Sequence, residues 1–165
     1  FYDPEIEFFY ARLIPRCSKG AVRAVFDQLE NTMGTYDFQT VFEIILTDRG
    51  SEFSDPGRLE TGINDLQRSS IYYCDPMRSC QKAGIEQVHT MLRMIIPKGT
   101  VFTDLTQWDV RKCVNHINAT PRAALNGNTP YMLAMDKYGK RICHMELQLR
   151  YVAPDDVTLT PKLLK

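Results

Sequence analysis

The fold is decided by the stretch Ile44-Ile45-Leu46-Thr47-Asp48-Arg49-Gly50-Ser51-Glu52-Phe53. A short run of branched apolar residues ends here in an acid, which is followed by a glycine turn. Such a run predicts a buried β-strand that carries Asp48 to the edge of a sheet. A second acid, Glu86, follows 38 positions later at the start of an amphipathic helix. A carboxylate at a strand end and another on a nearby helix can share one divalent metal ion, which points to metal-assisted phosphoryl transfer on nucleic acid.

The rest of the chain alternates between strand and helix patterns. Further strands are predicted over residues 8–14 and 70–74, and Phe1-Tyr2 is interpreted as the end of an earlier strand, with Asp3-Pro4 opening the turn. Helices are predicted over about 19–33, 57–66, 85–96, 106–118 and 129–139, and the last fifteen residues as an extended tail. This order predicts an α/β protein with a mixed sheet and helices on both of its faces.

Start and stop signals support several of these helices. Ser18 can cap the helix that begins at residue 19, and Gly34 can end it. Thr106 and Asp109 have the spacing of a capping box. Thr129 is followed by a proline, which is typical of a capped helix start.

Composition and charge limit the classes of function. A chain of 165 residues suits one domain with a real core, and no apolar run reaches the roughly 18 residues that span a bilayer. No signal peptide is visible, and five cysteines without a C-x-x-C pair favour free thiols in a reducing cytosol, so a cytoplasmic protein without a membrane partner is expected. Net charge is zero, but residues 1–77 hold seven Lys/Arg against thirteen Asp/Glu, whereas residues 78–165 hold thirteen against seven. The basic half can face phosphate.

The predicted helix after Gly84 has an apolar and a polar face. At 100° per residue, one stripe faces the core, and it consists of Ile85, Val88, Leu92, Ile95 and Ile96. Glu86, Thr90 and Arg93 gather roughly opposite, with His89 at the border. Lys82 before the helix and Lys98 after it add positive charge. We therefore predict Glu86 as a catalytic metal ligand, and Lys82, His89, Arg93 and Lys98 as DNA-binding residues.

Each of these residues also has a structural alternative. Asp48 could serve only to start the turn before Gly50, and Glu86 could be a solvated acid that the helix dipole favours. His116 and His144 have no ligand spacing and are interpreted as structural or surface residues. Trp108 is predicted to anchor the core.

Two acids are fewer than two-metal phosphoryl transfer requires, because that reaction normally uses three or more carboxylates. We expect the remaining acid on a strand before Phe1-Tyr2. Asp3 is the alternative near the N-terminus, although its turn context suits a ligand poorly. A hydrolase that uses Asp48 and Glu86 as an acid/base pair is a further alternative, and it predicts activity without metal.

Several motifs together resemble one known family. They are Ile45-Leu46-Thr47-Asp48-Arg49-Gly50-Ser51-Glu52-Phe53, Tyr73-Cys74-Asp75-Pro76, Gln81-Lys82-Ala83-Gly84-Ile85-Glu86-Gln87, Leu92-Arg93, Pro97-Lys98-Gly99-Thr100, Asn118-Ala119-Thr120-Pro121-Arg122 and Thr129-Pro130. In this order, over about residues 8–138, they resemble the IS-thirty group of bacterial insertion-sequence transposases. That group belongs to the DDE integrase superfamily, which shares the ribonuclease H-like fold. Two departures are Arg49, where the family usually has Asn, and Ala83, where Gly is common; Arg49 could pair with a phosphate or with Glu52.

The resemblance implies a ribonuclease H-like mixed sheet flanked by helices and lacking its first strand. Residues 1–140 would be an N-terminally truncated integrase-type core, and residues 141–165 a C-terminal extension. Asp48 and Glu86 would be the second and third acids of a DDE set that binds Mg²⁺ or Mn²⁺. The implied function is DNA strand cleavage and strand transfer by a homo-oligomer, in the cytoplasm and associated with the nucleoid.

The missing first strand leads to two further expectations. The chain alone should be inactive or nearly so, and the alternative function is that of a non-catalytic, truncated transposase that binds DNA or inhibits a full-length partner. Exposed ladder groups and apolar surface should also make the isolated chain marginally stable or self-associating.

Overall fold

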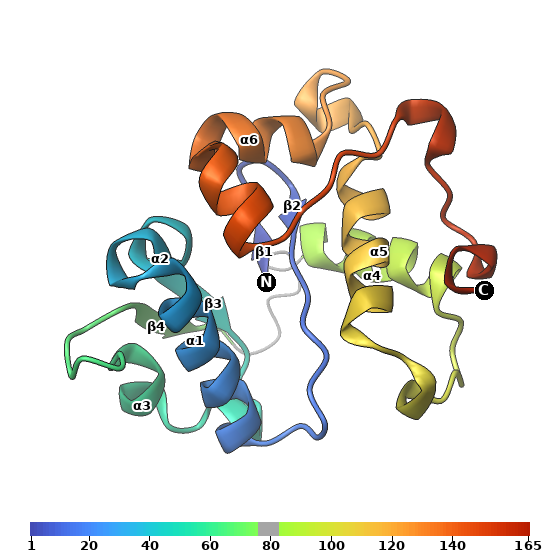
Figure 1. Cartoon of the computed structure of the whole chain (residues 1–165). Coiled ribbons are helices and arrows are strands. Elements are labelled where there is room, and N and C mark those ends of the chain that lie inside the picture. Colours follow the sequence, from blue (N-terminus) through green and yellow to red (C-terminus); the bar gives the residue numbers. More distant parts are fainter. Residues whose placement is uncertain (76–82) are drawn as a thin grey trace. The chain divides into compact units, whose positions relative to one another are not determined.

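The computed structural model describes residues 1–75 and 83–165 (Figure 1). These residues divide into two compact units: a first unit of residues 1–13 and 83–165, and a second unit of residues 14–75. Strands and helices occur in both units, which confirms the predicted mixture of α and β structure, with helix the more abundant. In this part of the chain, none of the helices is both long and apolar enough to cross a membrane.

The second unit packs helices against a small parallel sheet. Strand β3 (Ile44–Thr47) pairs in parallel with β4 (Ser70–Tyr73), with Ile44 opposite Ser70. The other elements of this unit are α1 (Lys19–Met33), α2 (Thr35–Phe42), the 3₁₀ turn η1 (Ser51–Phe53) and α3 (Pro56–Glu60). Its buried apolar side chains include Phe26, Leu29, Met33, Phe38, Phe42, Leu59 and Ile71.

The limits of α1 are those predicted from the sequence. The Ser18 hydroxyl accepts a hydrogen bond from the backbone N–H of Ala21 at 3.3 Å. Gly34 ends the helix with φ +78° and donates its N–H to the Glu30 carbonyl at 2.7 Å. Because this left-handed glycine turns the chain within one residue, α2 begins at once at Thr35.

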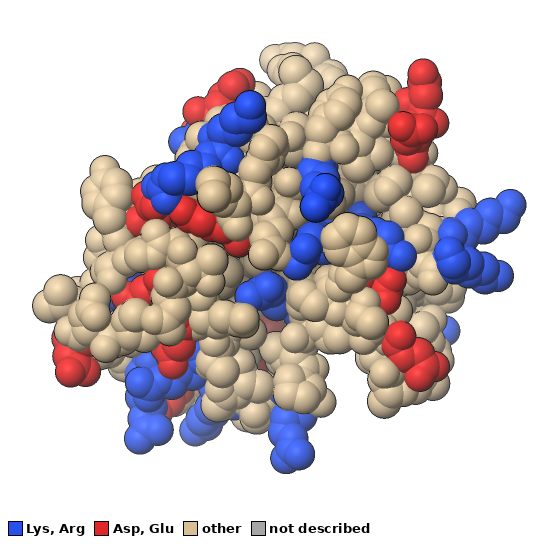
Figure 2. Space-filling view, viewed as in Figure 1, with Lys and Arg blue, Asp and Glu red and all other residues tan. Residues whose placement is uncertain are grey.

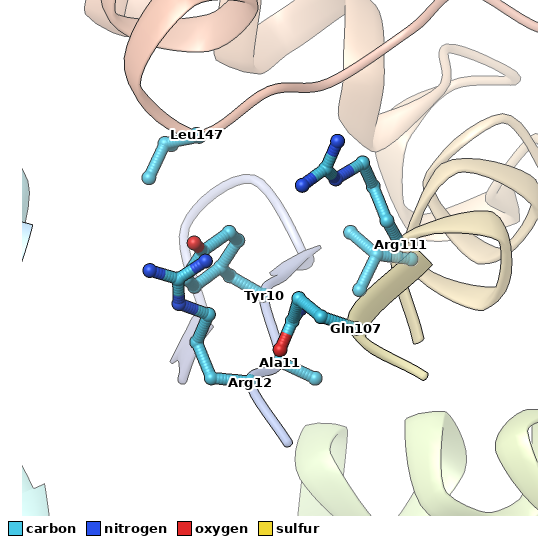
Figure 3. Close-up of a pocket in the computed structure, with 7 residues that line it drawn as sticks. Tyr10, Ala11, Arg12, Gln107, Arg111 and Leu147 are labelled. Atoms are coloured by element: carbon cyan, nitrogen blue, oxygen red, sulfur yellow. The ribbon is translucent and has the colours of Figure 1, made fainter. Parts of the chain in front are cut away.

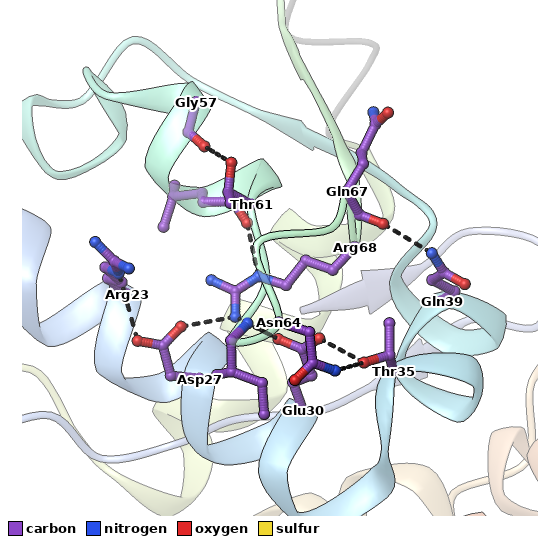
Figure 4. Close-up of polar contacts among 12 residues, drawn as sticks. Arg23, Asp27, Glu30, Thr35, Gln39, Gly57, Thr61, Asn64, Gln67 and Arg68 are labelled. Carbon is purple, nitrogen blue, oxygen red and sulfur yellow. Dashed lines mark hydrogen bonds and ion pairs between the residues drawn. The ribbon is translucent and has the colours of Figure 1, made fainter.

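A buried arginine fastens β4 to α1 (Figure 4). The Arg68 side chain is fully buried, and its Nη1 lies 2.7 Å from Asp27 Oδ1 and 3.0 Å from Glu30 Oε2 (Figure 4). Its guanidinium carbon also lies 5.4 Å and 5.6 Å from the ring centroids of Phe26 and Phe38. Arg68 lies two residues before β4, so this cluster fixes the start of the strand that pairs with β3.

The first unit joins a short hairpin to three longer helices. Strand β1 (Tyr2–Asp3) pairs antiparallel with β2 (Phe8–Phe9). The helices are α4 (Ala83–Ile95), α5 (Gln107–Asn118) and α6 (Pro130–Arg141), followed by the π-helical turn η5 (Ile142–Glu146). Short 3₁₀ turns complete the unit: η3 (Phe102–Asp104), η4 (Ala123–Leu125), η6 (Pro154–Asp156) and η7 (Pro161–Leu164).

Polar side chains anchor the hairpin to two of these helices. The buried amide of Asn118, at the end of α5, accepts the Phe9 N–H at 2.9 Å and donates to the Phe9 carbonyl at 2.7 Å. On α6, Lys137 Nζ lies 2.8 Å from Asp3 Oδ2, and the Tyr138 hydroxyl donates to the same oxygen. The hairpin is therefore fixed at both strands.

The strand prediction around Asp48 is correct in position and wrong in burial. Thr47 and Ile71 are buried, but Ile44, Leu46 and Tyr72 are 69%, 50% and 57% exposed. Side chains alternate across a strand, so only one face of β3 and β4 is packed.

The predicted sheet also differs from the observed one. The strands in the described ranges form two separate two-stranded sheets, one in each unit, rather than one mixed sheet. The strand predicted over residues 8–14 ends at Phe9, after which the side-chain amide of Gln107, on α5, binds the backbone at Leu13. The ribonuclease H-like arrangement and the division of the chain at residue 140 stay predictions.

Candidate active site

Asp48 lies directly after β3, where the chain leaves the sheet. The Cys74 N–H donates to the Thr47 carbonyl at 2.8 Å, so strand pairing continues up to the residue before Asp48. The Asp48 side chain is exposed, and its Oδ1 accepts the N–H of Gly50 at 3.1 Å. This bond shapes the turn, as expected for an aspartate two residues before a glycine. An exposed carboxylate thus follows directly after the end of the strand.

The turn after Asp48 is held by close contacts. A Cβ atom on Gly50 would lie 2.8 Å from the Glu52 carboxylate, so this position requires glycine unless Glu52 moves. The Tyr73 hydroxyl, from β4, donates to the Phe53 carbonyl, and the Arg49 guanidinium lies 5.8 Å from the Tyr73 ring centroid. Arg49 therefore lies against Tyr73, a contact that the sequence did not suggest.

Glu86 is in the first turn of α4, with its side chain exposed. Among residues 1–75 and 83–165, its carboxylate has no ion-pair partner. The preceding Gly84 lies against Tyr2, and a Cβ atom there would be 2.2 Å from the Tyr2 hydroxyl oxygen. Glycine at this position thus lets β1 approach the start of α4.

The two faces of α4 agree with the predicted periodicity. Val88 and Ile95 are almost completely buried, at 2% and 1% exposure. Glu86, His89 and Arg93 are exposed at spacings of three and four residues, which places them on one side of the helix. Lys98, after the helix, is exposed as well, whereas Lys82 lies outside the described residues. DNA binding by these four residues stays a prediction.

The two predicted catalytic acids belong to different units, Asp48 to the second and Glu86 to the first. In the two described ranges, no group of three or more His, Cys, Asp or Glu side chains is arranged to hold a metal ion. Asp3, the alternative for the remaining acid, accepts bonds from Lys137, Tyr138 and the Glu5 N–H. Burial raises the pKa of Asp3, but these hydrogen bonds outweigh it and hold the pKa below its ordinary value. Asp3 thus serves as an anchor of the hairpin.

The other residues considered from the sequence have structural contacts. His116 Nδ1 accepts the Thr158 N–H at 3.1 Å, and His144 Nε2 lies 2.8 Å from the Tyr131 hydroxyl oxygen, in agreement with the structural roles predicted for both. The prediction that Trp108 anchors the core is wrong, because this residue is 50% exposed. Its position in the first turn of α5 places the ring beside arginines rather than in the core.

Sequence reasoning missed a group of basic residues around Trp108. Arg111 lies on the same helix, but Arg12 and Arg150 come from segments far apart in the chain. The excess of Lys/Arg in residues 78–165 includes Arg111 and Arg150, but no signal in the sequence pointed toward Arg12.

About half of the chain is similar to proteins that are named as an integrase and as transposases of insertion sequence elements. The protein named "Putative integrase ORF3" of Spiroplasma virus SpV1-R8A2 B is 37% identical over 82 residues, which cover 50% of this chain and 24% of that protein. The transposase for insertion sequence element IS1086 of Cupriavidus metallidurans is 29% identical over 85 residues, 50% of this chain and 23% of the relative. The transposase for insertion sequence element IS4351 of Bacteroides fragilis is 26% identical over 92 residues, 56% of this chain and 27% of the relative.

The matched segment thus spans only about a quarter of the length of these relatives. No protein-family model matches the chain. No solved structure matches it either.

Proposed function

We propose that this chain forms part of the catalytic core of a DDE transposase of the IS-thirty group. The observation that carries the proposal is the similarity of half of the chain to proteins named as an integrase and as transposases of insertion sequences. The local settings of Asp48 and Glu86 support it, because both carboxylates are exposed at the ends of ordered elements. The proposed activity is cleavage of DNA strands and their transfer to a target, by a homo-oligomer in the bacterial cytoplasm, associated with the nucleoid.

Asp48 and Glu86 are suited to hold Mg²⁺ or Mn²⁺. Carboxylate oxygens are the ligands that these hard cations prefer, and neither side chain is buried. The bound metal would activate the attacking oxygen and stabilise the leaving oxygen of a phosphodiester. A further carboxylate, expected from the family resemblance on the first strand of the sheet, would complete the set.

Basic residues near Glu86 would position the DNA. His89, Arg93 and Lys98 are exposed on or just after α4, and the prediction adds Lys82. Cationic side chains that follow a helix face can bind successive backbone phosphates without reading sequence. In the proposed reaction, water cuts the donor strand and the released 3′-hydroxyl then attacks a phosphodiester of the target.

The test is a strand-transfer assay with the complete product of the reading frame that encodes this chain. The donor is a plasmid with the DNA that flanks that reading frame. We expect cleavage and joined products with Mg²⁺ or Mn²⁺ and none with EDTA. Asp48→Asn and Glu86→Gln should abolish both products, whereas the exposed acids Glu43 and Asp104 provide matched controls, Glu43→Gln and Asp104→Asn, which should remain active.

Three other outcomes contradict the proposal. Full activity of Asp48→Asn or Glu86→Gln would remove these residues from the chemistry. Activity that persists in EDTA would favour the acid/base hydrolase. DNA binding without cleavage in any metal would favour the non-catalytic, inhibitory alternative.

A further inference from the structure

Two arginines lie against the single tryptophan of the chain, and a third lines a hollow beside one of them. Together these residues form what we call the Trp108 patch: Arg12, Trp108, Arg111 and Arg150. The guanidinium carbons of Arg111 and Arg150 lie 5.6 Å and 5.9 Å from the centre of the Trp108 ring. At these distances the ring attracts both cations and holds them near each other. In the described part of the chain, none of the three arginines forms an ion pair with a carboxylate.

The patch is built by amide side chains of α5, which bind the backbones of two distant segments. Gln107 Oε1 accepts the Leu13 N–H at 2.8 Å, and this bond places Arg12 next to α5. Asn115 Oδ1 accepts the Arg150 N–H at 3.1 Å and fixes the backbone of the third arginine. All of these residues belong to the first unit. The three positive charges are therefore brought together by specific bonds rather than by chance surface exposure.

Two of these arginines, Arg12 and Arg111, line a shallow hollow (Figure 3). It is lined by Tyr10, Arg12, Gln107 and Arg111, with Leu147 among the others, and it is too shallow to enclose a small molecule (Figure 3). Burial raises the pKa of the Tyr10 hydroxyl, while the charges of Arg12 and Arg111 act in the opposite direction. Both guanidinium groups therefore lie close enough to act on the same buried hydroxyl.

The acid nearest in sequence does not neutralise the patch. Asp109 follows Trp108, but its carboxylate binds the Thr106 hydroxyl and N–H and forms an ion pair with Lys112 at 2.9 Å. Figure 2 shows Lys and Arg side chains gathered over α5 on the face in view. Arginine forks suit phosphate oxygens, and a shallow basic surface suits an extended polyanion better than a small anion.

We propose that the Trp108 patch binds the phosphate backbone of double-stranded DNA without reading its sequence. The proposal rests on the proposed function for the choice of DNA as the polyanion. The surface is distinct from the residues predicted around Glu86, so it adds a second contact through which the protein holds donor or target DNA.

The test measures binding of a fluorescent duplex of arbitrary sequence to the 165-residue chain, in EDTA and over a series of salt concentrations. Each phosphate contact contributes about 0.9 to the magnitude of the slope of log K against log salt concentration, where K is the association constant for DNA. Between 1 M and 0.1 M salt, one such contact therefore changes K by roughly a factor of ten. Arg12→Gln/Arg111→Gln/Arg150→Gln should therefore reduce the slope by about 3 and weaken binding at 0.1 M salt by about 100-fold or more. The single change Arg150→Gln, at an exposed side chain, should reduce the slope by about 1.

A charge-matched variant provides the control. Lys140, Lys162 and Lys165 are exposed, so Lys140→Gln/Lys162→Gln/Lys165→Gln removes the same charge outside the patch and should weaken binding less than about threefold. Trp108 is the only tryptophan, so its fluorescence should change in a saturable way with the same Kd. Equal losses in the two triple variants, or DNA binding that leaves the Trp108 fluorescence unchanged, would overturn the proposal.

The outcome can be separated from that of the proposed function. Binding is measured without metal, so this readout does not depend on metal held by Asp48 and Glu86. If the patch variant loses binding as predicted but strand transfer is never observed, the proposed function fails and the patch stands. If strand transfer depends on both acids but the patch variant binds normally, the patch fails alone.

Discussion

At the scale of single residues, buried polar side chains determine how the segments of each unit meet. In the second unit the guanidinium of Arg68 lies between Asp27 and Glu30, and it also donates from Nε to the Leu59 carbonyl at 2.8 Å. In the first unit, Arg122 is nearly buried, lies 3.3 Å from Glu7, and donates to the Ile117 carbonyl at the end of α5. The guanidinium groups of Arg68 and Arg122 both hold segments of the fold together, so neither group is available to bind DNA.

We expect Arg68→Met to lower the free energy of unfolding by about 3–5 kcal/mol, because it leaves the buried Glu30 carboxylate without its cation. Arg58→Met is the matched control, since Arg58 pairs with Asp55 but its side chain is 72% exposed. That change should cost less than about 1 kcal/mol. Urea unfolding followed by circular dichroism measures both, and equal losses would show that burial of the Arg68 cluster has no energetic role.

At the scale of elements, the helix ends have local causes that the sequence states directly. Ser18 caps α1, and Thr129 caps α6 by accepting the Met132 N–H at 3.2 Å. In the capping box of α5, Thr106 and Asp109 each bind the backbone N–H of the other. These bonds use only neighbouring residues, and the predictions for all three helix starts are confirmed.

The capping box makes stability depend on pH. Hydrogen bonds from Lys112 and Thr106 lower the pKa of Asp109 from 3.8 to about 2. Because the folded-state pKa is the lower one, the stabilisation is present above pH 3.8 and is lost as pH falls toward about 2. Over this pH range, the free energy of unfolding should fall by about 1 kcal/mol more in the unchanged protein than in Asp109→Asn. This figure is reduced because the side chain is partly exposed to solvent.

Thermal unfolding at a series of pH values measures this difference. Asp136→Asn is the matched control for the loss of one carboxylate, because Asp136 is exposed on α6, outside the capping box. Parallel curves for the unchanged protein and Asp109→Asn would contradict the assignment.

Elements that depend on distant residues could not be predicted in the same way. Helix α2 is not predicted from the sequence, because Gly34 ends one helix and begins the next. The sequence pattern therefore does not separate residues 35–42 from the segment that leads into β3. The strand over residues 8–14 was predicted too long because Gln107 and Asn118, about a hundred positions away, bind that backbone. The helical period did predict which residues of α4 are exposed. The exposure of a residue there depends only on the geometry of the helix and on the packing of one helix face against the core.

The residues of the candidate site also differ in whether their positions could be predicted from the sequence. The exposed position of Asp48 follows from an apolar run that ends in an acid, and that of Glu86 from the helix period, so both could be predicted. The Trp108 patch could not, because Arg12 and Arg150 reach α5 through bonds between side chains and distant backbone. Trp108 itself was assigned to the core on residue type alone, and its place among cations reversed that expectation.

At the scale of the whole molecule, the described residues form two units, and the small parallel sheet of the second unit has one face whose apolar side chains are half or more exposed. Ile44, Leu46 and Tyr72 are the exposed apolar residues of that face. Adjacent apolar residues on an open two-stranded sheet favour association of the surface with a second apolar surface. That the isolated chain is marginally stable or self-associating stays a prediction.

We expect the isolated chain to show concentration-dependent association in sedimentation velocity. The double variant Ile44→Thr/Leu46→Thr should weaken this association at least about tenfold, because it removes apolar surface area. Threonine is β-branched and compatible with a strand, so the sheet itself should be kept. Val101→Thr/Phe102→Thr is the matched control, since both of these residues are 62% exposed in the first unit. A monomer at all concentrations, or equal effects of the two double variants, would contradict this role of the β3–β4 face.

The central claim is that Asp48 and Glu86 bind the same metal ion, and cleavage of the protein backbone by bound Fe²⁺ tests it most directly. With added hydrogen peroxide and ascorbate, Fe²⁺ that replaces Mg²⁺ reduces the peroxide to hydroxide and a hydroxyl radical, and ascorbate reduces the resulting Fe³⁺ again. The radicals cut the chain beside the ion, and mass spectrometry locates the cuts. With the complete product of the reading frame and DNA present, we predict cuts both at the turn after β3 and at the start of α4, and loss of both in Asp48→Asn as well as in Glu86→Gln. Cuts at only one of the two places, or cuts at one place that survive the loss of the other acid, would contradict a shared ion.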